Sequence, residues 1–273
     1  MYDCEGRKIR PTGMPKGLAS SAAPKIAAKL KSISGGKILD VATGDGDFIR
    51  TLIKTLKDYD SFVGVDNSKK EVESARNQLK EQPARILEMN AEALQFKDNS
   101  FDTVCTSYSL HHLQNIDTVL AEMKRVLKPN GHFIIQEQFS DGKQSEAQKT
   151  SILQHHWDAK IDNLFGVSHH KTLTKKKIKD AVSKLQLREI TVFESTWSVK
   201  CLFCKSRFKC ENPKDEQMDS QAIKGIDKNL EKLKGHPDSE TRNRLEEQGR
   251  KLKERIKKTG VSEASHLFII GKK

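Results

Sequence analysis

The stretch Lys37-Ile-Leu-Asp-Val-Ala-Thr-Gly-Asp-Gly46 decides the fold of this chain. Its apolar start has the pattern of a short strand, and apolar residues after it recur at helical spacing from Phe48 to Leu56. A strand that passes through a glycine turn into a helix brings backbone N–H groups and the helix N-terminus to the carboxyl edge of a sheet. Ser61-Phe-Val-Gly-Val-Asp66 predicts a second strand, ending in an acid that can accept hydrogen bonds from both hydroxyls of a ribose.

The rest of the chain continues this alternation of strands and helices. Ser68 is the expected N-cap of a charged helix, with Glu71 three residues on as in a capping box. Pro129 and Gly131 are expected to stop a helix over residues 117–127. Further strands are predicted over residues 84–89, 101–107, 131–138, 187–193 and 265–270, and a further helix over residues 175–185. Such alternation predicts an α/β fold, with helices on both faces of the sheet.

Two segments interrupt the alternation. Residues 140–172 join the fifth strand to the next helix, and residues 197–262 separate the sixth strand from the last. Apolar residues in the second segment follow two helical faces, which predicts a helical hairpin packed over the sheet edge, and we expect the two segments to form a lid. The predicted organisation is a basic N-terminal segment over residues 1–36, a main domain over residues 37–196 plus 263–273, and an insertion over residues 197–262.

The charge of the chain is uneven. The 273 residues include 49 Lys+Arg and 37 Asp+Glu, a net charge of +12, and the excess lies mainly in residues 1–36 and 197–262. Such basic segments attract phosphates, acidic lipids or nucleic acid, or form a solvated surface. No apolar run reaches the roughly 20 residues of a membrane span, and the N-terminus lacks the apolar segment of a secretory signal. We therefore expect a cytoplasmic protein with reduced cysteines.

The turn after the first strand does not fit a pyrophosphate. The dinucleotide fingerprint has a third glycine where this chain has Ile49. Asp40 lies just before the turn and would repel a pyrophosphate, but it suits a ligand with a cationic end.

The chain resembles the class I S-adenosylmethionine (SAM) methyltransferases. Motifs typical of that family follow one another in order, which is far more specific than a lone glycine turn. They are Ile38–Asp47, Val63–Asp66, Asn90-Ala-Glu-Ala-Leu94, Phe101-Asp-Thr-Val104, Tyr108-Ser-Leu-His-His-Leu113 and Arg125–Gly131. The most similar branch includes the ubiquinone/menaquinone C-methyltransferases and the arsenite methyltransferases. The resemblance covers residues 34–139 strongly, and residues 174–195 and 265–271 weakly. It implies a Rossmann-like, seven-stranded mixed sheet with the last strand antiparallel.

The resemblance implies contacts with the methionine part of SAM. Gly44 and Gly46 would make room for it, and Asp40 would lie near its amino group. Ser107, at the end of the fourth strand, would face the reacting sulfonium. Ala42 departs from the more familiar glycine at its position, a variant of the quinone-type branch. The alternative is a fold of this class that no longer binds SAM.

The resemblance also implies contacts with the nucleoside. Asp66 would hold the ribose hydroxyls, and Asn67 would lie against the adenine. Asn90 stands where the family often has Asp, and its amide oxygen can still accept a hydrogen bond from the adenine amino group. The backbone N–H of Ala91 would serve a ring nitrogen.

Methyl transfer from a sulfonium needs a base only if the acceptor must lose a proton. Candidate catalytic residues near the carboxyl edge are Tyr108, His111, His112 and Glu137. Each has another interpretation, since the two histidines suit packing on the sheet and Glu137 suits a surface position. Trp157 suits a core or lid position more than a substrate platform.

Cys201, Cys204 and Cys210 supply three soft ligands within ten residues. A closed zinc site needs a fourth ligand, which one residue of the pairs His155-His156 or His169-His170 could provide. Three interpretations stay open: plain reduced cysteines, a zinc or iron–sulfur site, and thiolates that hold a thiophilic substrate such as arsenite.

Together these patterns predict an enzyme that transfers a methyl group from SAM to a small-molecule acceptor and releases S-adenosylhomocysteine. The alternatives are RNA or protein methylation, arsenite-type methylation, and a non-catalytic SAM-binding module. The sequence does not indicate the oligomeric state, and nucleic acid is a partner only in the RNA alternative.

Overall fold

The computed structural model describes residues 22–196 and 215–273, which form parts of two compact units. The first, here called the sheet unit, comprises Ala22–Glu137, Lys175–Glu194 and His266–Lys273. The second, the helical unit, comprises Gln138–Thr174 and the described part of Ser195–Ser265. Residues 22–36 thus belong to the sheet unit and residues 138–174 to the helical unit. The predicted organisation into residues 1–36, 37–196 plus 263–273, and 197–262 stays a prediction.

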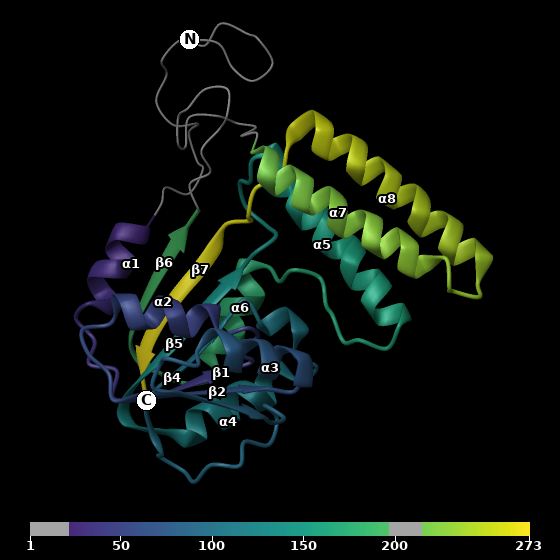
Figure 1. The fold of residues 1–273 in the computed structure, drawn as a ribbon. Helices are drawn as coiled ribbons and strands as arrows, with labels where there is room; N and C mark the ends of the chain where they lie inside the picture. Colours follow the sequence, from purple (N-terminus) through teal and green to yellow (C-terminus); the bar gives the residue numbers. More distant parts are fainter. Residues whose placement is uncertain (1–21, 197–214) are drawn as a thin grey trace, which may run out of the picture. The chain divides into compact units, whose positions relative to one another are not determined.

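A seven-stranded sheet lies at the centre of the sheet unit, with strand order β3-β2-β1-β4-β5-β7-β6 (Figure 1). The pairs β1–β2, β2–β3, β1–β4 and β4–β5 are parallel, and β7 runs antiparallel to β6. The bounds are β1 (Lys37–Val41), β2 (Ser61–Asp66), β3 (Ala84–Glu88), β4 (Phe101–Ser107), β5 (Leu127–Gln138), β6 (Arg188–Ser195) and β7 (His266–Lys272). The predicted α/β fold with an antiparallel last strand is confirmed.

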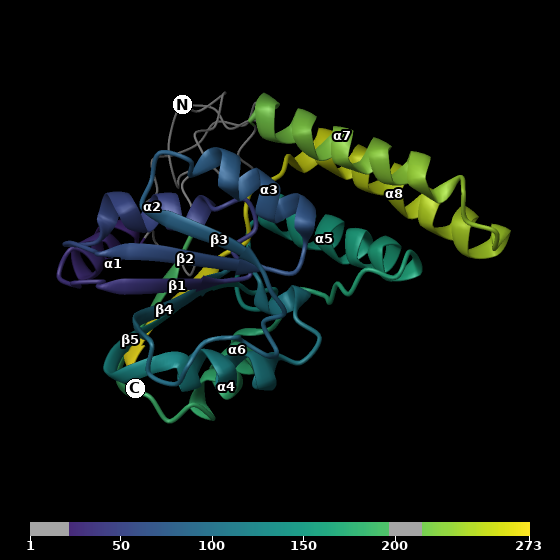
Figure 2. The ribbon, with the colours of Figure 1, turned by 60° about the horizontal axis from the view of Figure 1, so that its bottom comes forward.

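Helices cover both faces of this sheet (Figure 2). On one side lie α1 (Ala23–Leu30), α2 (Asp47–Thr55) and α3 (Lys69–Gln78), and on the other lie α4 (Ile116–Val126) and α6 (Lys175–Ser183). Ser68 caps α3 as predicted, since its Oγ accepts the Glu71 N–H at 3.4 Å. Apolar side chains of the strands and helices meet in one core that includes Ile38, Ile49, Leu52, Phe62 and Leu79.

The fifth strand starts earlier than predicted. Helix α4 ends at Val126, and β5 begins at once with Leu127, so that Pro129 lies inside the strand. Leu127 pairs with Phe101, and the register then shifts before the next pair of the ladder. A bulge of this kind explains how a residue without an N–H is accommodated.

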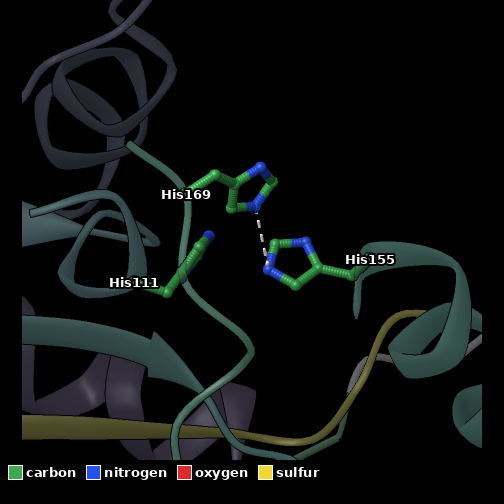
Figure 3. Close-up of side chains that lie close together, drawn as sticks. All are labelled: His111, His155 and His169. Atoms are coloured by element: carbon green, nitrogen blue, oxygen red, sulfur yellow. Dashed lines mark hydrogen bonds between the residues drawn. The ribbon is translucent and has the colours of Figure 1, made fainter. Parts of the chain in front are cut away.

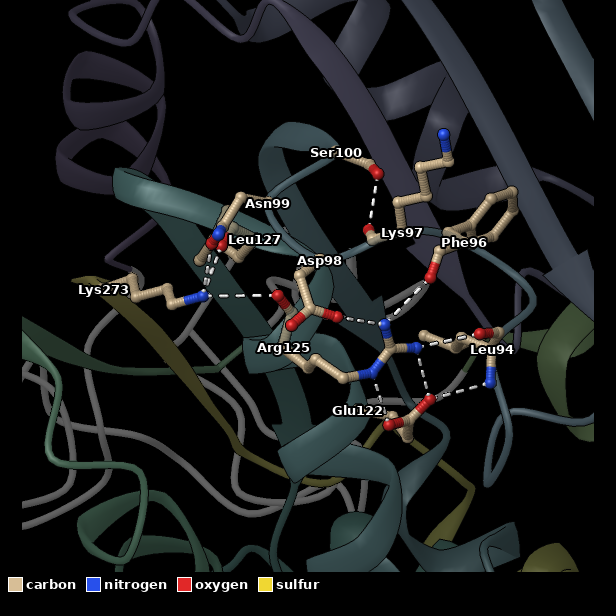
Figure 4. A network of polar contacts seen from close by, with 10 residues as sticks. All are labelled: Leu94, Phe96, Lys97, Asp98, Asn99, Ser100, Glu122, Arg125, Leu127 and Lys273. Carbon is tan, nitrogen blue, oxygen red and sulfur yellow. Dashed lines mark hydrogen bonds and ion pairs between the residues drawn. The ribbon is translucent and has the colours of Figure 1, made fainter.

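A network around Arg125 fastens the segment after β3 to α4 (Figure 4). The Arg125 guanidinium donates to the carbonyls of Leu94 and Phe96, each at 2.8 Å. Glu122 Oε2 accepts the Leu94 N–H at 2.9 Å and Arg125 Nη2 at 2.7 Å. The hydrogen bonds from Arg125 lower the pKa of Glu122, because they stabilise its charged form. This network holds in place the segment that follows Asn90.

The helical unit contains three long helices, α5 (Glu146–Leu164), α7 (Glu216–Leu233) and α8 (Ser239–Thr259). Helices α7 and α8 form the predicted hairpin, and both pack against α5. Their shared core contains Trp157, Ile161, Ile226, Leu233, Leu245, Leu252, Ile256 and Val261. Trp157 is a core residue here, because it is 2% exposed and its Nε1 donates to the Leu245 carbonyl at 2.9 Å.

Helix α5 was not predicted. Its N-terminus carries a complete capping box between Ser145 and Gln148, but its buried face includes polar residues as well as apolar ones. Gln148 Nε2 donates to Ser265 Oγ at 3.2 Å, and the hydroxyls of Thr150 and Thr259 lie 2.8 Å apart. A search for apolar periodicity misses a helix whose buried positions are partly polar. In residues 22–196 and 215–273 no helix is long and apolar enough to cross a membrane.

Candidate functional site

The turn between β1 and α2 has residues with left-handed backbone conformation and open space beside Gly44. Ala42, Gly44 and Gly46 have φ of 54°, 53° and 88°, in a region that glycine enters at little cost. A Cβ on Gly46 would lie 2.6 Å from Leu79 Cδ1, so the packing of α2 near α3 requires glycine there. A Cβ on Gly44 would meet nothing within 4 Å. The backbone at Gly44 is therefore accessible to a ligand.

Asp66 ties the end of β2 to this turn. Its Oδ2 accepts the Gly44 N–H at 2.9 Å, and its Oδ1 accepts the Ser68 N–H at 2.9 Å. The side chain is partly exposed. Each carboxylate oxygen has a second lone pair, so Asp66 can still accept hydrogen bonds from two hydroxyls.

Asp40 lies buried beneath the same turn, with 1% of its surface exposed. Thr43 Oγ1 donates to its Oδ2 at 2.6 Å, and Cys105 Sγ lies 3.4 Å from its Oδ1. Burial raises the pKa of Asp40 to about 7, although these two hydrogen bonds lower it. Burial also raises the pKa of the Cys105 thiol, which therefore stays protonated. A nearby cation would stabilise the ionised form of Asp40, so this position favours a positively charged ligand group.

The residues predicted to contact the nucleoside follow neighbouring strands. Asp66 ends β2, which pairs in parallel with β3, and Asn90 and Ala91 follow the end of β3. Asn67 and Asn90 are exposed, and Ala91 is partly buried. Asn90 Oδ1 accepts the Glu92 N–H at 2.9 Å, which shapes a local turn and leaves the oxygen one further lone pair.

Polar side chains also gather where β4 and β5 end. Ser107 Oγ donates to Gln136 Oε1 at 3.3 Å, and Gln136 Nε2 donates to the Tyr108 hydroxyl at 3.0 Å. Tyr108 has a φ of 49°, and its ring lies edge-on to His266 with centroids 6.0 Å apart. Burial lowers the pKa of His266 to about 4, so its imidazole is neutral near pH 7. Ser109 Oγ lies 3.1 Å from the Ala42 carbonyl, which joins this cluster to the glycine turn.

A buried acid–histidine pair adjoins the cluster. Glu137 is fully buried, and His111, in the short turn η1 (Leu110–His112), is 2% exposed. Glu137 Oε1 lies 2.9 Å from His111 Nδ1, and its Oε2 accepts the Leu110 N–H at 2.7 Å. In the tautomer whose Nδ1–H donates to this carboxyl group, Nε2 carries no hydrogen. The interpretation of Glu137 as a surface acid is wrong, and of the predicted catalytic set only His112 is exposed.

Comparisons with known proteins agree with this geometry. The family model described as a methyltransferase domain matches residues 39–135. A demethylmenaquinone methyltransferase from Lactococcus lactis is 34% identical over 113 residues, 40% of this chain and 45% of that protein. A ubiquinone/menaquinone biosynthesis C-methyltransferase UbiE from Geotalea uraniireducens is 37% identical over 113 residues, 40% of this chain and 48% of that protein. The chain thus spans less than half the length of these curated relatives.

Residues 39–135 thus match a methyltransferase domain, and this part of the chain is similar to the class I SAM-dependent methyltransferases. The YcgJ protein of Bacillus subtilis shares its fold with a TM-score of 0.53 and 18% identity, covering 92% of this chain and 97% of that chain. A phosphoethanolamine N-methyltransferase 2 of Haemonchus contortus, in complex with phosphomonomethylethanolamine and S-adenosylhomocysteine, has a TM-score of 0.51 and 16% identity. That match covers 94% of this chain and 54% of that chain. Identities this low show the fold alone.

Several residues of the methyltransferase domain site were missed by the sequence analysis. Thr43 and Cys105 contact Asp40, Gln136 contacts Ser107 and Tyr108, and His266 contacts the Tyr108 ring. Gln136 had a usable signal, since it lies just before the end of a predicted strand. Cys105 and His266 had none, because their partners are distant in the sequence.

The predicted metal ligands Cys201, Cys204 and Cys210 lie outside the described residues, so a zinc or iron–sulfur site at these positions stays a prediction. Among the residues that the structure describes, Cys105 is a buried free thiol.

Proposed function

We propose that this protein transfers a methyl group from SAM to a small-molecule acceptor and releases S-adenosylhomocysteine. The observation that carries the proposal is the hydrogen bond from the Gly44 N–H to Asp66, directly beside the buried Asp40. This arrangement offers one carboxylate to a ribose, another to an ammonium group, and open backbone between them. The sulfonium methyl is already electrophilic, so the main tasks of the protein are in-line positioning and exclusion of water.

The proposed cofactor contacts are those that the motifs predict. Asp40 lies near the amino group of SAM, directly or through water, and Asp66 holds the ribose hydroxyls. Asn67, Asn90 and the Ala91 N–H surround the adenine. The remaining proposed contacts, with the methionine part and the sulfonium, are Ala42, Gly44, Gly46 and Ser107.

We assign the proton acceptor of the reaction to His111. Its Nδ1 lies 2.9 Å from Oε1 of the fully buried Glu137, so in the tautomer that carries the proton on Nδ1 the basic nitrogen is Nε2. As the acceptor atom attacks the methyl carbon, the bond from that carbon to sulfur breaks and its electron pair stays on sulfur. The acceptor atom then loses its proton to His111 Nε2, and the imidazolium is stabilised by the Glu137 carboxylate. Tyr108, held by Gln136, orients the acceptor through its hydroxyl.

An acceptor with an electron-rich, hydroxylated aromatic ring suits this site best. Methylation of a ring carbon requires loss of a proton, which is the step that the His111–Glu137 pair serves. The two relatives named above carry names that refer to menaquinone and ubiquinone synthesis, which supports the same class.

The lid that the sequence predicts over residues 140–172 and 197–262 stays a prediction.

A turnover assay tests the proposal. The full chain is incubated with methyl-labelled SAM and, separately, with a dihydroxynaphthalene, a phenol, arsenite, transfer RNA or a basic protein. We expect S-adenosylhomocysteine and a labelled product with the dihydroxynaphthalene. Label in RNA or protein overturns the small-molecule assignment, label on arsenic overturns the ring assignment, and SAM binding without any turnover indicates a non-catalytic binding module.

A further inference from the structure

Two histidines of the helical unit point their ring nitrogens at each other. His155 lies on α5 and His169 lies in the segment after that helix. Their Nε2 atoms are 3.2 Å apart, and Figure 3 shows the two imidazoles facing nitrogen to nitrogen. His155 is partly buried and His169 is 6% exposed. The contact therefore lies mostly away from bulk water.

An acid stands behind one of the rings. His169 Nδ1 lies 2.8 Å from Asp162 Oδ2, and Asp162 Oδ1 lies 3.3 Å from Lys232 Nζ. In the tautomer whose Nδ1–H donates to this carboxylate, His169 Nε2 carries no hydrogen and presents its lone pair towards His155. A carboxylate on the far nitrogen of an imidazole is the usual partner of a metal-binding histidine, because it fixes the tautomer and raises the basicity of the ligand.

The backbone holds this arrangement in place. His155 and Asp162 are seven residues apart on α5, which puts the ligand and the acid on one face of the helix, two turns apart. The chain then turns back at Gly166, whose φ is 79°. Asn163 Nδ2 donates to the His169 carbonyl at 2.5 Å, which fixes the returning segment against the end of the helix.

We propose that His155 and His169 form a binding site for a divalent transition-metal ion such as zinc, with Asp162 as the positioning acid. Two imidazole nitrogens about 2.0–2.1 Å from one tetrahedral ion lie about 3.3–3.4 Å apart, close to the distance between the two Nε2 atoms. Two protein ligands leave coordination positions open for water or other groups. The competing explanation is a simple N–H···N hydrogen bond, in which His155 Nε2 carries the hydrogen.

This proposal does not rest on the proposed methyl transfer, because its residues belong to the helical unit and those proposed for methyl transfer belong to the sheet unit. It uses one residue of each His-His pair. His156 and His170, the neighbours of the two proposed ligands, provide matched controls: His170 is exposed, and His156 Nε2 is buried without a hydrogen-bond partner in the described residues.

A zinc titration against a chromophoric chelator tests the proposal on the full chain. Zinc is measured for the wild type, for H155Q, H169Q and D162N, and for the controls H156Q and H170Q. We expect H155Q and H169Q each to weaken zinc binding at least tenfold, D162N to weaken it by about 10- to 100-fold, and the controls to leave it unchanged. Circular dichroism of the helices shows that each variant is folded.

Clustered cysteines also bind zinc, so the series is repeated in a background that carries C201S, C204S and C210S. The histidine site is supported if zinc binding is retained in this background and is abolished by H155Q and by H169Q. Equal zinc binding by the double variant H155Q/H169Q and the wild type, or loss of all binding in the cysteine-free background, overturns it.

Discussion

The Gly44 N–H donates to Asp66 Oδ2 at 2.9 Å, so one carboxylate joins the glycine turn to the end of the neighbouring strand. Asp66 therefore serves the shape of the turn even before a ligand is present. Because the other lone pairs of the carboxylate stay available, ligand binding and turn geometry depend on the same side chain. This double dependence makes Asp66 the most informative position for a first variant.

Replacement of Asp66 by Ala should weaken SAM binding strongly. Loss of the proposed ribose contacts and of the hydrogen bond that shapes the turn costs about 1–3 kcal/mol, or about 5- to 150-fold in Kd. Isothermal titration calorimetry with SAM measures the change. D60N, at an exposed acid just before β2, is the control and should bind as the wild type does. Unchanged affinity in D66A contradicts the assignment of the cofactor site.

The buried Asp40 should make stability depend on pH. Its pKa is raised to about 7 in the folded protein, so between pH 4 and 7 the native state binds more protons than the unfolded chain. The contribution of Asp40 to the free energy of unfolding is therefore present below pH 4 and is lost as the pH rises to 7. We expect the free energy of unfolding of D40N to depend less on pH than that of the wild type. Above pH 7, D40N should be more stable than the wild type. Urea unfolding of both proteins at pH 5, 6, 7 and 8 measures this free energy. The same dependence on pH in the wild type and D40N contradicts the prediction.

Replacement of Ala42 by glycine should stabilise the protein. Its φ of 54° lies in the left-handed region, which costs a residue with a Cβ roughly 1–2 kcal/mol, partly offset by the flexibility of glycine in the unfolded chain. We expect A42G to raise the free energy of unfolding by about 0.5–1 kcal/mol. A121G, on the exposed face of α4, should instead lower it by about 1 kcal/mol. Chemical denaturation measures the free energy of unfolding of both variants. A lower value than the wild type in both would show that Ala42 is not strained.

His111 and Glu137 should act as a unit in turnover. H111Q and E137Q are each expected to lower kcat by about 10²–10⁴-fold while the Kd for SAM stays nearly constant, because proton acceptance and not cofactor binding is removed. The exposed neighbour supplies the control, since H112Q should keep its activity. Single-turnover rates with the dihydroxynaphthalene provide the measurement. Equal rates for H111Q and H112Q exclude His111 as the base.

Two glycines within helices should respond oppositely to a methyl group. A Cβ on Gly249, in α8, would lie 2.8 Å from the Trp157 ring, whereas a Cβ on Gly225, in α7, would lie 3.7 Å from its nearest neighbour, Gln154. We expect G249A to destabilise the helical unit by about 1–3 kcal/mol through overpacking. G225A should stabilise it by about 0.5–1 kcal/mol, because alanine is the better helix former. Thermal unfolding followed by circular dichroism measures both, and stabilisation by G249A contradicts the packing of α8 on Trp157.

The sequence by itself determined the local parts of the methyltransferase domain. The glycine turn, Asp66 at the end of β2 and the Ser68 cap depend on residues that are close in the chain, and their patterns are short and specific. Once the strands alternate with helices, the carboxyl ends of the parallel strands must share one edge, so Asp40, Asp66 and Ser107 were predictable neighbours.

The tertiary structure alone decided the burial and the partners of the remaining site residues. Glu137 is fully buried and meets His111 across 26 residues of chain, and the Tyr108 ring meets His266 from the last strand. The pairing of His155 with His169 depends on the turn at Gly166, and α5 was hidden by polar residues at buried positions. These features arise from the packing of elements that are distant in the sequence. Local patterns of polarity do not predict which distant side chain will contact a given residue.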